Sequence, residues 1–189
     1  MKLNKLLVAV SLAFATFAVQ AENRGFITLE GELENKHGTE NDVNSFNLIP
    51  GVKLGDYTVD LKVQAQSTDN TKATSANIEP RVKYNYKIGM TDFSVWGRLG
   101  LGEKIQSSGN FGYYTVEPGV SYSVMKDLKL TVSDRYRDSF SEDKGYRTNT
   151  IYAGGTYDVN SFDTVGLKLY RKYGETESNG VEFNYTRWF

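Results

Sequence analysis

Residues 57–66 read Tyr-Thr-Val-Asp-Leu-Lys-Val-Gln-Ala-Gln, in which apolar and polar side chains alternate at every position. Successive side chains of a β-strand point to opposite faces, so this pattern predicts a strand with one apolar face and one polar face. Residues 77–88 repeat the alternation, and residues 181–189 close the chain with it. The sequence therefore predicts an all-β protein.

Segments of this kind recur about ten times, near 26–34, 45–54, 57–66, 77–88, 93–101, 114–124, 128–136, 151–159, 165–173 and 181–189. The turns near 55–56, 89–91, 125–127 and 160–161 are short, whereas the loops near 35–44, 68–75, 103–112, 139–145 and 174–179 are longer and polar. Short turns at one end and longer loops at the other are typical of outer-membrane barrels. We predict a single antiparallel transmembrane β-barrel of about ten strands, with both termini on the periplasmic, short-turn side.

The first 21 residues have the features of a secretory signal. Lys2 and Lys5 precede an apolar run over 6–19, and Ala21 precedes Glu22 at a small-residue cleavage site. The run is too short and too early for a spanning helix. We therefore predict a cleaved signal peptide over 1–21 and a barrel over 22–189, located in the outer membrane of a Gram-negative bacterium.

The final residue, Phe189, also fits this location. A terminal aromatic residue on such a strand resembles the insertion signal of outer-membrane barrels. The expected partners are therefore outer-membrane lipid and lipopolysaccharide, periplasmic chaperones and the barrel-assembly machinery. The expected oligomeric state is a monomer.

Composition excludes several other classes of protein. The chain has no cysteine, so a disulfide-stapled scaffold is excluded. A net charge of −1 without a dense basic stretch argues against nucleic-acid binding. The one histidine, His37, leaves little for a His-based catalytic or metal site. We expect no enzymatic activity, no cofactor and no metal site.

Two features of the apolar face need explanation. The three prolines, Pro50, Pro80 and Pro118, fall inside predicted strands, where proline removes a ladder hydrogen bond, so we expect them on the outer face, with bulges as one way to accommodate them. Asp134 and Arg187 put a charge among apolar residues, which is tolerated close to a membrane interface; a bulge at Asp134 is the alternative. A secreted soluble sandwich or lipocalin-like barrel would instead turn the apolar faces inward.

If the apolar residues face lipid, the polar set faces the lumen. The cations of that set predicted to line a substrate or ion pathway are Arg81, Lys83, Arg98, Lys129, Arg135, Arg137, Lys168 and Lys172. The predicted opposing acidic wall consists of Glu30, Glu32, Glu34 and Glu182. Walls of opposite sign would orient and select charged solutes. Alternatively the charges pair and plug the barrel, because ten strands lie between the filled eight-stranded and the open sixteen-stranded case.

Four short motifs carry a resemblance to a known family. They are Tyr-Thr-Val-Glu-Pro-Gly-Val at 114–120, Asp-Leu-Lys-Leu at 127–130, Arg-Tyr-Arg at 135–137 and Lys-Gly-Tyr at 144–146. Together they resemble the oligogalacturonate-specific porin family, which includes sialic-acid channels. Members are twelve-stranded outer-membrane barrels with arginine-lined lumens that pass acidic oligosaccharides. The resemblance implies that Arg135 and Arg137 line such a path, in a narrower barrel.

These observations predict a passive outer-membrane channel for small acidic solutes such as acidic sugars. The alternative is a non-conducting barrel that serves as an adhesin, an anchor or a structural envelope protein.

Overall fold

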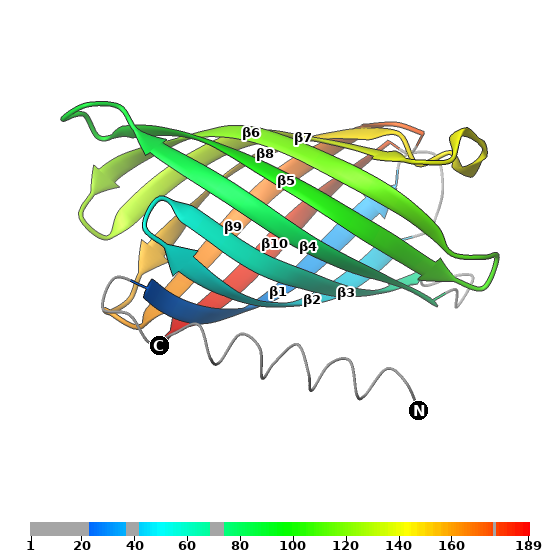
Figure 1. Ribbon diagram of the computed structural model, residues 1–189, viewed down its shortest axis with the longest axis horizontal. Helices are drawn as coiled ribbons and strands as arrows, with labels where there is room; N and C mark the ends of the chain where they lie inside the picture. The colour runs from blue at the N-terminus through cyan, green and yellow to red at the C-terminus, as the bar shows by residue number, and fades with distance from the viewer. Residues whose placement is uncertain (1–22, 37–41, 69–73, 176) are drawn as a thin grey trace.

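The computed structural model describes residues 23–36, 42–68, 74–175 and 177–189, which form a closed barrel of ten antiparallel strands (Figure 1). The strands are β1 (Asn23–Lys36), β2 (Asp42–Leu54), β3 (Tyr57–Thr68), β4 (Thr74–Lys87), β5 (Phe93–Gln106), β6 (Phe111–Met125), β7 (Leu128–Ser139), β8 (Thr148–Asp158), β9 (Asp163–Gly174) and β10 (Ser178–Trp188). The predicted fold class and strand number are confirmed. The predicted signal peptide and His37 lie outside the described residues.

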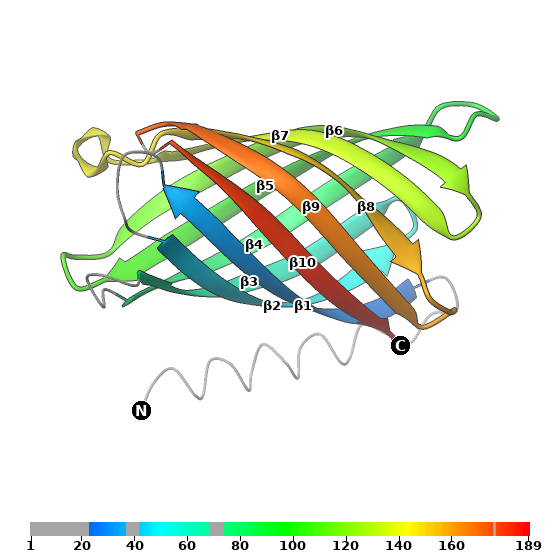
Figure 2. The same cartoon turned by 180° about the vertical axis from the view of Figure 1, so that it is seen from behind.

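The barrel closes where the two ends of the sheet meet. β1 pairs with β10 from Phe26 opposite Trp188 to Lys36 opposite Ser178. Figure 2 shows β10 lying between β1 and β9. The N–H of Phe189 donates to the carbonyl of Gly25 at 2.9 Å, which extends the ladder by one residue. Closure leaves no free strand edge, so every strand has a partner on both sides.

The connections at the two ends differ less in length than the sequence predicts, because residues 88–92 between β4 and β5 outnumber residues 107–110 between β5 and β6 at the other end. Two-residue turns join β2 to β3 and β6 to β7, at the end where β10 finishes. At the other end, residues 140–147 form a longer loop with a short 3₁₀ helix, η1 (Glu142–Lys144). The loop predicted at 103–112 is shorter than expected, because Lys104 pairs with Phe111 and the β5–β6 hairpin continues to that point.

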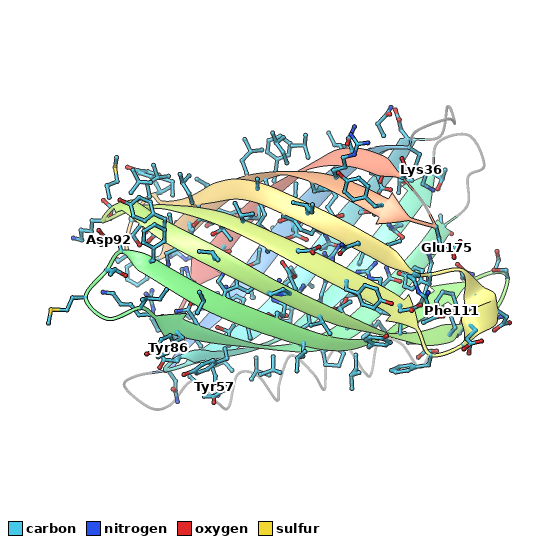
Figure 3. The ribbon with its side chains drawn as sticks, turned by 90° about the horizontal axis from the view of Figure 1, so that it is seen from above. Lys36, Tyr57, Tyr86, Asp92, Phe111 and Glu175 are labelled. Carbon is cyan, nitrogen blue, oxygen red and sulfur yellow. The ribbon has the colours of Figure 1, made fainter. Side chains whose placement is uncertain are left out.

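The outer wall of the barrel is apolar. Its exposed side chains include Ile27, Leu29, Leu33, Leu99, Leu101, Leu130, Val132, Leu167, Leu169 and Phe183. Aromatic side chains gather at the short-turn end, where Tyr57 packs on Tyr84 and Phe93 on Tyr122. Figure 3 shows Tyr57 at this end and Phe111 at the other. A soluble lipocalin-like barrel would have the reverse arrangement, because here the polar set is the buried one.

The prolines lie on the outer wall without distorting it. Pro80 and Pro118 are exposed, and Pro50 shares the outward face of Phe46. The pairing of β2 with β3 has the same register on both sides of Pro50, so no bulge accommodates it. The ladder shifts instead between Ser123 and Met125, next to a turn. Within the described residues, no helix is long and apolar enough to cross a membrane.

Candidate functional site

The inner wall is lined by buried charges. Glu30, Glu32, Glu34, Asp60, Lys62, Glu79, Arg81, Glu117 and Glu182 are each less than a tenth exposed. A charge removed from water to this extent must be paired and hydrogen-bonded, since an isolated one is too costly to bury. The partners of each charge therefore show how the lumen is held together.

One cluster joins β1, β2 and β3. The Lys62 ammonium lies 2.8 Å from Glu30 Oε1 and 3.0 Å from Glu32 Oε1. Asn47, on the strand between them, donates from Nδ2 to the same two oxygens at 2.7 and 2.8 Å. The Gln64 amide also donates to Glu32. One lysine and two amides therefore satisfy two adjacent glutamates.

The same cluster extends to β9 and β10. Carboxylate oxygens of Glu30, Glu32 and Glu182 all lie within 4.8 Å of one another, a grouping that could hold a cation. Lys168 pairs with Glu182, and Lys62 pairs with the other two. The two ammonium groups thus already supply the positive charge that such a grouping requires.

A second cluster crosses the lumen from β4 to β6 and β7. Glu79 accepts hydrogen bonds from Thr115 Oγ1 at 2.6 Å and from the Tyr113 hydroxyl at 3.1 Å. Arg137 Nη2 lies 3.7 Å from the same carboxylate. Arg81, two residues along β4, donates from Nε to Asp60 at 2.6 Å.

Further pairs complete the inner wall. Arg98 lies 3.1 Å from Glu117, which also accepts from Ser133. Lys172 lies 2.6 Å from Glu34. Each member of the predicted acidic wall, Glu30, Glu32, Glu34 and Glu182, therefore has a lysine beside it. The glutamates of β1 and β10 are thus paired with lysines from the nearby strands β3 and β9.

Aromatic rings fill the lumen between these clusters. Tyr113 and Tyr170 are buried, and each lies directly opposite a glycine, Gly102 and Gly180. A Cβ atom added at Gly102 would lie 2.3 Å from the Tyr113 ring, and one at Gly180 would lie 2.2 Å from the Tyr170 ring. The glycines therefore allow both rings to lie flat against the wall. Tyr152 packs on Tyr170 with their centroids 5.4 Å apart.

The filled middle of the lumen separates two cavities. The cavity at the short-turn end has a volume of about 390 Å³ and the one at the long-loop end about 370 Å³. Between the two cavities lies a layer of buried, inward-facing residues that line neither of them. We call it the central layer, and its members are Asn47, Glu32, Gln64, Asn77, Glu79, Tyr113, Thr115, Thr150 and Tyr170. Tyr113 is 0% exposed and Glu79 is 2% exposed, so this layer closes the lumen.

Both cavities carry more cations than carboxylates. Lys53, Lys62, Arg81, Lys83, Arg98, Lys129, Arg135 and Lys168 line the short-turn cavity with Glu30, Asp56, Asp60, Glu117 and Glu182. Within the described residues, no ion pair involves Lys83, Lys129 or Arg135. Lys83 Nζ instead lies 3.9 Å from the centroid of the Trp96 ring, and Arg135 lies 5.0 Å from that of Tyr152. These cations remain available to an anion.

The structure brings the predicted pathway residues into two groups. Arg81, Lys83, Arg98, Lys129, Arg135 and Lys168 line the short-turn cavity, whereas Arg137 and Lys172 line the long-loop cavity. Sequence reasoning missed Tyr113, Tyr152 and Tyr170. The signal was present, since each of these tyrosines occupies a polar position of the alternation, as Tyr113 does two residues before Thr115.

Comparisons with known proteins support the fold. No family model matches the sequence, and no curated protein matches it. Among solved structures, the KdgM porin in complex with disordered oligogalacturonate is similar, with a TM-score of 0.52, 11% identity, and coverage of 86% of this chain and 98% of that one. Neisserial surface protein A gives a TM-score of 0.43 at 13% identity, covering 88% of this chain and 97% of that one. In fold, this chain is a closed antiparallel β-barrel similar to that of the KdgM porin.

Proposed function

We propose that the chain spans the outer membrane of a Gram-negative bacterium and serves as a channel for the passive uptake of small acidic solutes, such as acidic sugars. The observation that carries the proposal is the surplus of cations in both cavities. Within the described residues, six of these cations make no ion pair: Lys36, Lys53, Lys83, Lys104, Lys129 and Arg135. A guanidinium such as that of Arg135 presents parallel donors that match a carboxylate. The apolar outer wall supplies the surface that lipid requires.

In this proposal, the central layer blocks the passage between the two cavities. A solute moving between the cavities must displace the rings of Tyr113 and Tyr170 or break the Arg137–Glu79 contact. At 3.7 Å the Arg137–Glu79 contact is the longest ion pair that a residue of the central layer makes within the described residues, so we expect it to open first.

Planar-bilayer recording tests the proposal directly. Purified, folded protein should give discrete conductance steps, and the reversal potential in a salt gradient should show a preference for anions. Repeated absence of steps from folded protein would support the second candidate, a non-conducting barrel acting as an adhesin, an anchor or a structural envelope protein. The buried ion pairs of Lys62 with Glu30 and Glu32 favour that candidate.

Neutralising Arg135 should lower anion preference without unfolding the barrel. Arg135 makes no ion pair within the described residues, so the Arg135→Gln variant breaks no salt bridge. Hydrated contacts between an arginine and a carboxylate contribute roughly 0–1 kcal/mol, so we expect a change of several-fold in the permeability ratio. The matched variant Arg137→Gln removes a partner of Glu79 and should also lower stability. Equal stability losses in the two variants would contradict this assignment.

Cysteine labelling tests the proposed location and orientation. The chain has no cysteine, so single replacements give a clean signal. A membrane-impermeant maleimide should label Ser108→Cys, in the β5–β6 turn at the long-loop end, on intact cells. The Asp56→Cys variant, in the turn at the opposite end, should react only after the outer membrane is permeabilised. The reverse pattern would invert the orientation.

A further inference from the structure

Asp134 is an anomaly on the outer wall. It lies near the middle of β7, its side chain is exposed on the same face as Val132, and the pairing of β6 with β7 keeps one register on both sides of it. The bulge considered from the sequence is therefore absent. Among the described residues, its carboxylate accepts a hydrogen bond from Asn149 Nδ2 at 3.4 Å. Ionisable side chains at membrane depth are rare and are almost always paired with another group.

Arg171 presents the complementary charge two strands away. Asp134 pairs with Ile151 in the β7–β8 ladder, and Ile151 pairs with Arg171 in the β8–β9 ladder. The three residues therefore form one row on the outer wall, with opposite charges on either side of Ile151. Arg171 lies over the Tyr173 ring, 5.1 Å from its centroid, and within the described residues it makes no ion pair.

We propose that this face binds a second copy of the chain, related by a two-fold axis that passes close to Ile151 and runs parallel to the barrel axis. A two-fold axis of this kind exchanges the two sides of the face, so Asp134 of each copy lies on the same side of the axis as Arg171 of the other. Because the strands of a barrel are tilted, the two residues differ in height, and the long arginine side chain spans this difference so that two ion pairs form from one surface. The proposal rests on the membrane location proposed above.

The surrounding surface permits a close approach. The next two residues of β8 that face outward after Ile151 are the small Ala153 and Gly155, and Tyr157 follows them near the end of the strand. They lie between the larger Leu130 and Val132 on β7 and Leu167 and Leu169 on β9. Small residues on β8 leave room at the proposed contact, so side chains of the flanking strands can reach the second copy. Small residues serve the same purpose between membrane helices.

A second copy supplies a partner for both Asp134 and Arg171 from one surface. A lipid phosphate would satisfy Arg171 and leave Asp134 unpaired. An unrelated protein would have to bring a cation and an anion at the matching separation. The sequence favours a monomer, and disulfide cross-linking decides between the monomer and the dimer.

Disulfide cross-linking in outer membranes tests the proposal. Ile151→Cys, close to the proposed axis, should give a disulfide-linked dimer on mild oxidation. The control Val82→Cys lies on β4 with matched exposure, 40% against 44% for Ile151, and should remain monomeric. Folding of each variant is checked by heat-dependent mobility on gels. Folded, membrane-inserted Ile151→Cys protein that fails to cross-link, or that links to a different protein, would overturn the proposal without touching the proposed channel.

Charge reversal adds a second, independent test in the Ile151→Cys background. Asp134→Arg alone places two arginines opposite each other, and Arg171→Asp alone places two aspartates opposite each other, so each should lower the cross-linking yield several-fold. The double variant restores opposite charges and should recover the yield. Single variants that cross-link as well as the parent would overturn the proposal.

Discussion

Replacing Lys62 with methionine is expected to lower the free energy of unfolding by about 3–5 kcal/mol. Lys62 is 3% exposed, and its ammonium is the shared partner of Glu30 and Glu32. Methionine keeps a similar length but leaves two buried carboxylates without their cation. Urea titration of the barrel in lipid vesicles measures the loss.

Two further variants show whether the charge is the cause. Lys129→Met removes a lysine of the same cavity that is exposed and has no ion pair within the described residues, so it should change stability little. Adding Glu30→Gln and Glu32→Gln to Lys62→Met removes the uncompensated charges and should recover much of the loss, since replacing a whole buried pair is far less costly than removing one partner. A triple variant as unstable as Lys62→Met would mean that packing, not charge, determines the effect.

Removing two rings of the lumen is expected to raise single-channel conductance several-fold. Tyr152 lines the short-turn cavity, Tyr170 belongs to the central layer, and the two rings pack on each other. Alanine at both positions leaves space that water can fill, because the surrounding wall is polar. The two cavities would then join into one aqueous path, and the conductance steps in planar bilayers would report it.

The control for this experiment is Tyr84→Ala, which removes a ring of the same kind from the outer wall, where it packs on Tyr57. It should leave the conductance unchanged. If the double variant conducts no better than the parent, the barrier lies in the cluster around Lys62 and Glu32 rather than in the rings.

The strands could be predicted from the sequence because their signal is local. The alternation over 57–66 places Lys62 and Gln64 on the polar face without reference to any other segment. Strand ends were less certain: β5 and β6 run past the apolar stretch, and the pairing of Lys104 with Phe111 depends on the hairpin rather than on hydrophobicity.

The pairing of the lumen charges could not be predicted in the same way. Lys62 reaches Glu30 across the intervening β2, and Arg137 reaches Glu79 from a strand on another part of the wall. Such contacts depend on the register of every ladder between the two residues and on how far each side chain extends into the interior. The strand pattern therefore predicts which face of the sheet each charged residue occupies. Its ion-pair partner can be identified only from the closed barrel.

The glycines opposite the buried tyrosines affect the diameter of the lumen. A single methyl group at position 102 would force the Tyr113 ring off the wall and towards the barrel axis, since the two would otherwise lie 2.3 Å apart. The same holds for position 180 and Tyr170. The effective diameter is therefore encoded on β5 and β10, strands next to those that carry the rings. A barrel built in this way can narrow its passage through a one-carbon substitution, with no change in strand number or in any charged residue.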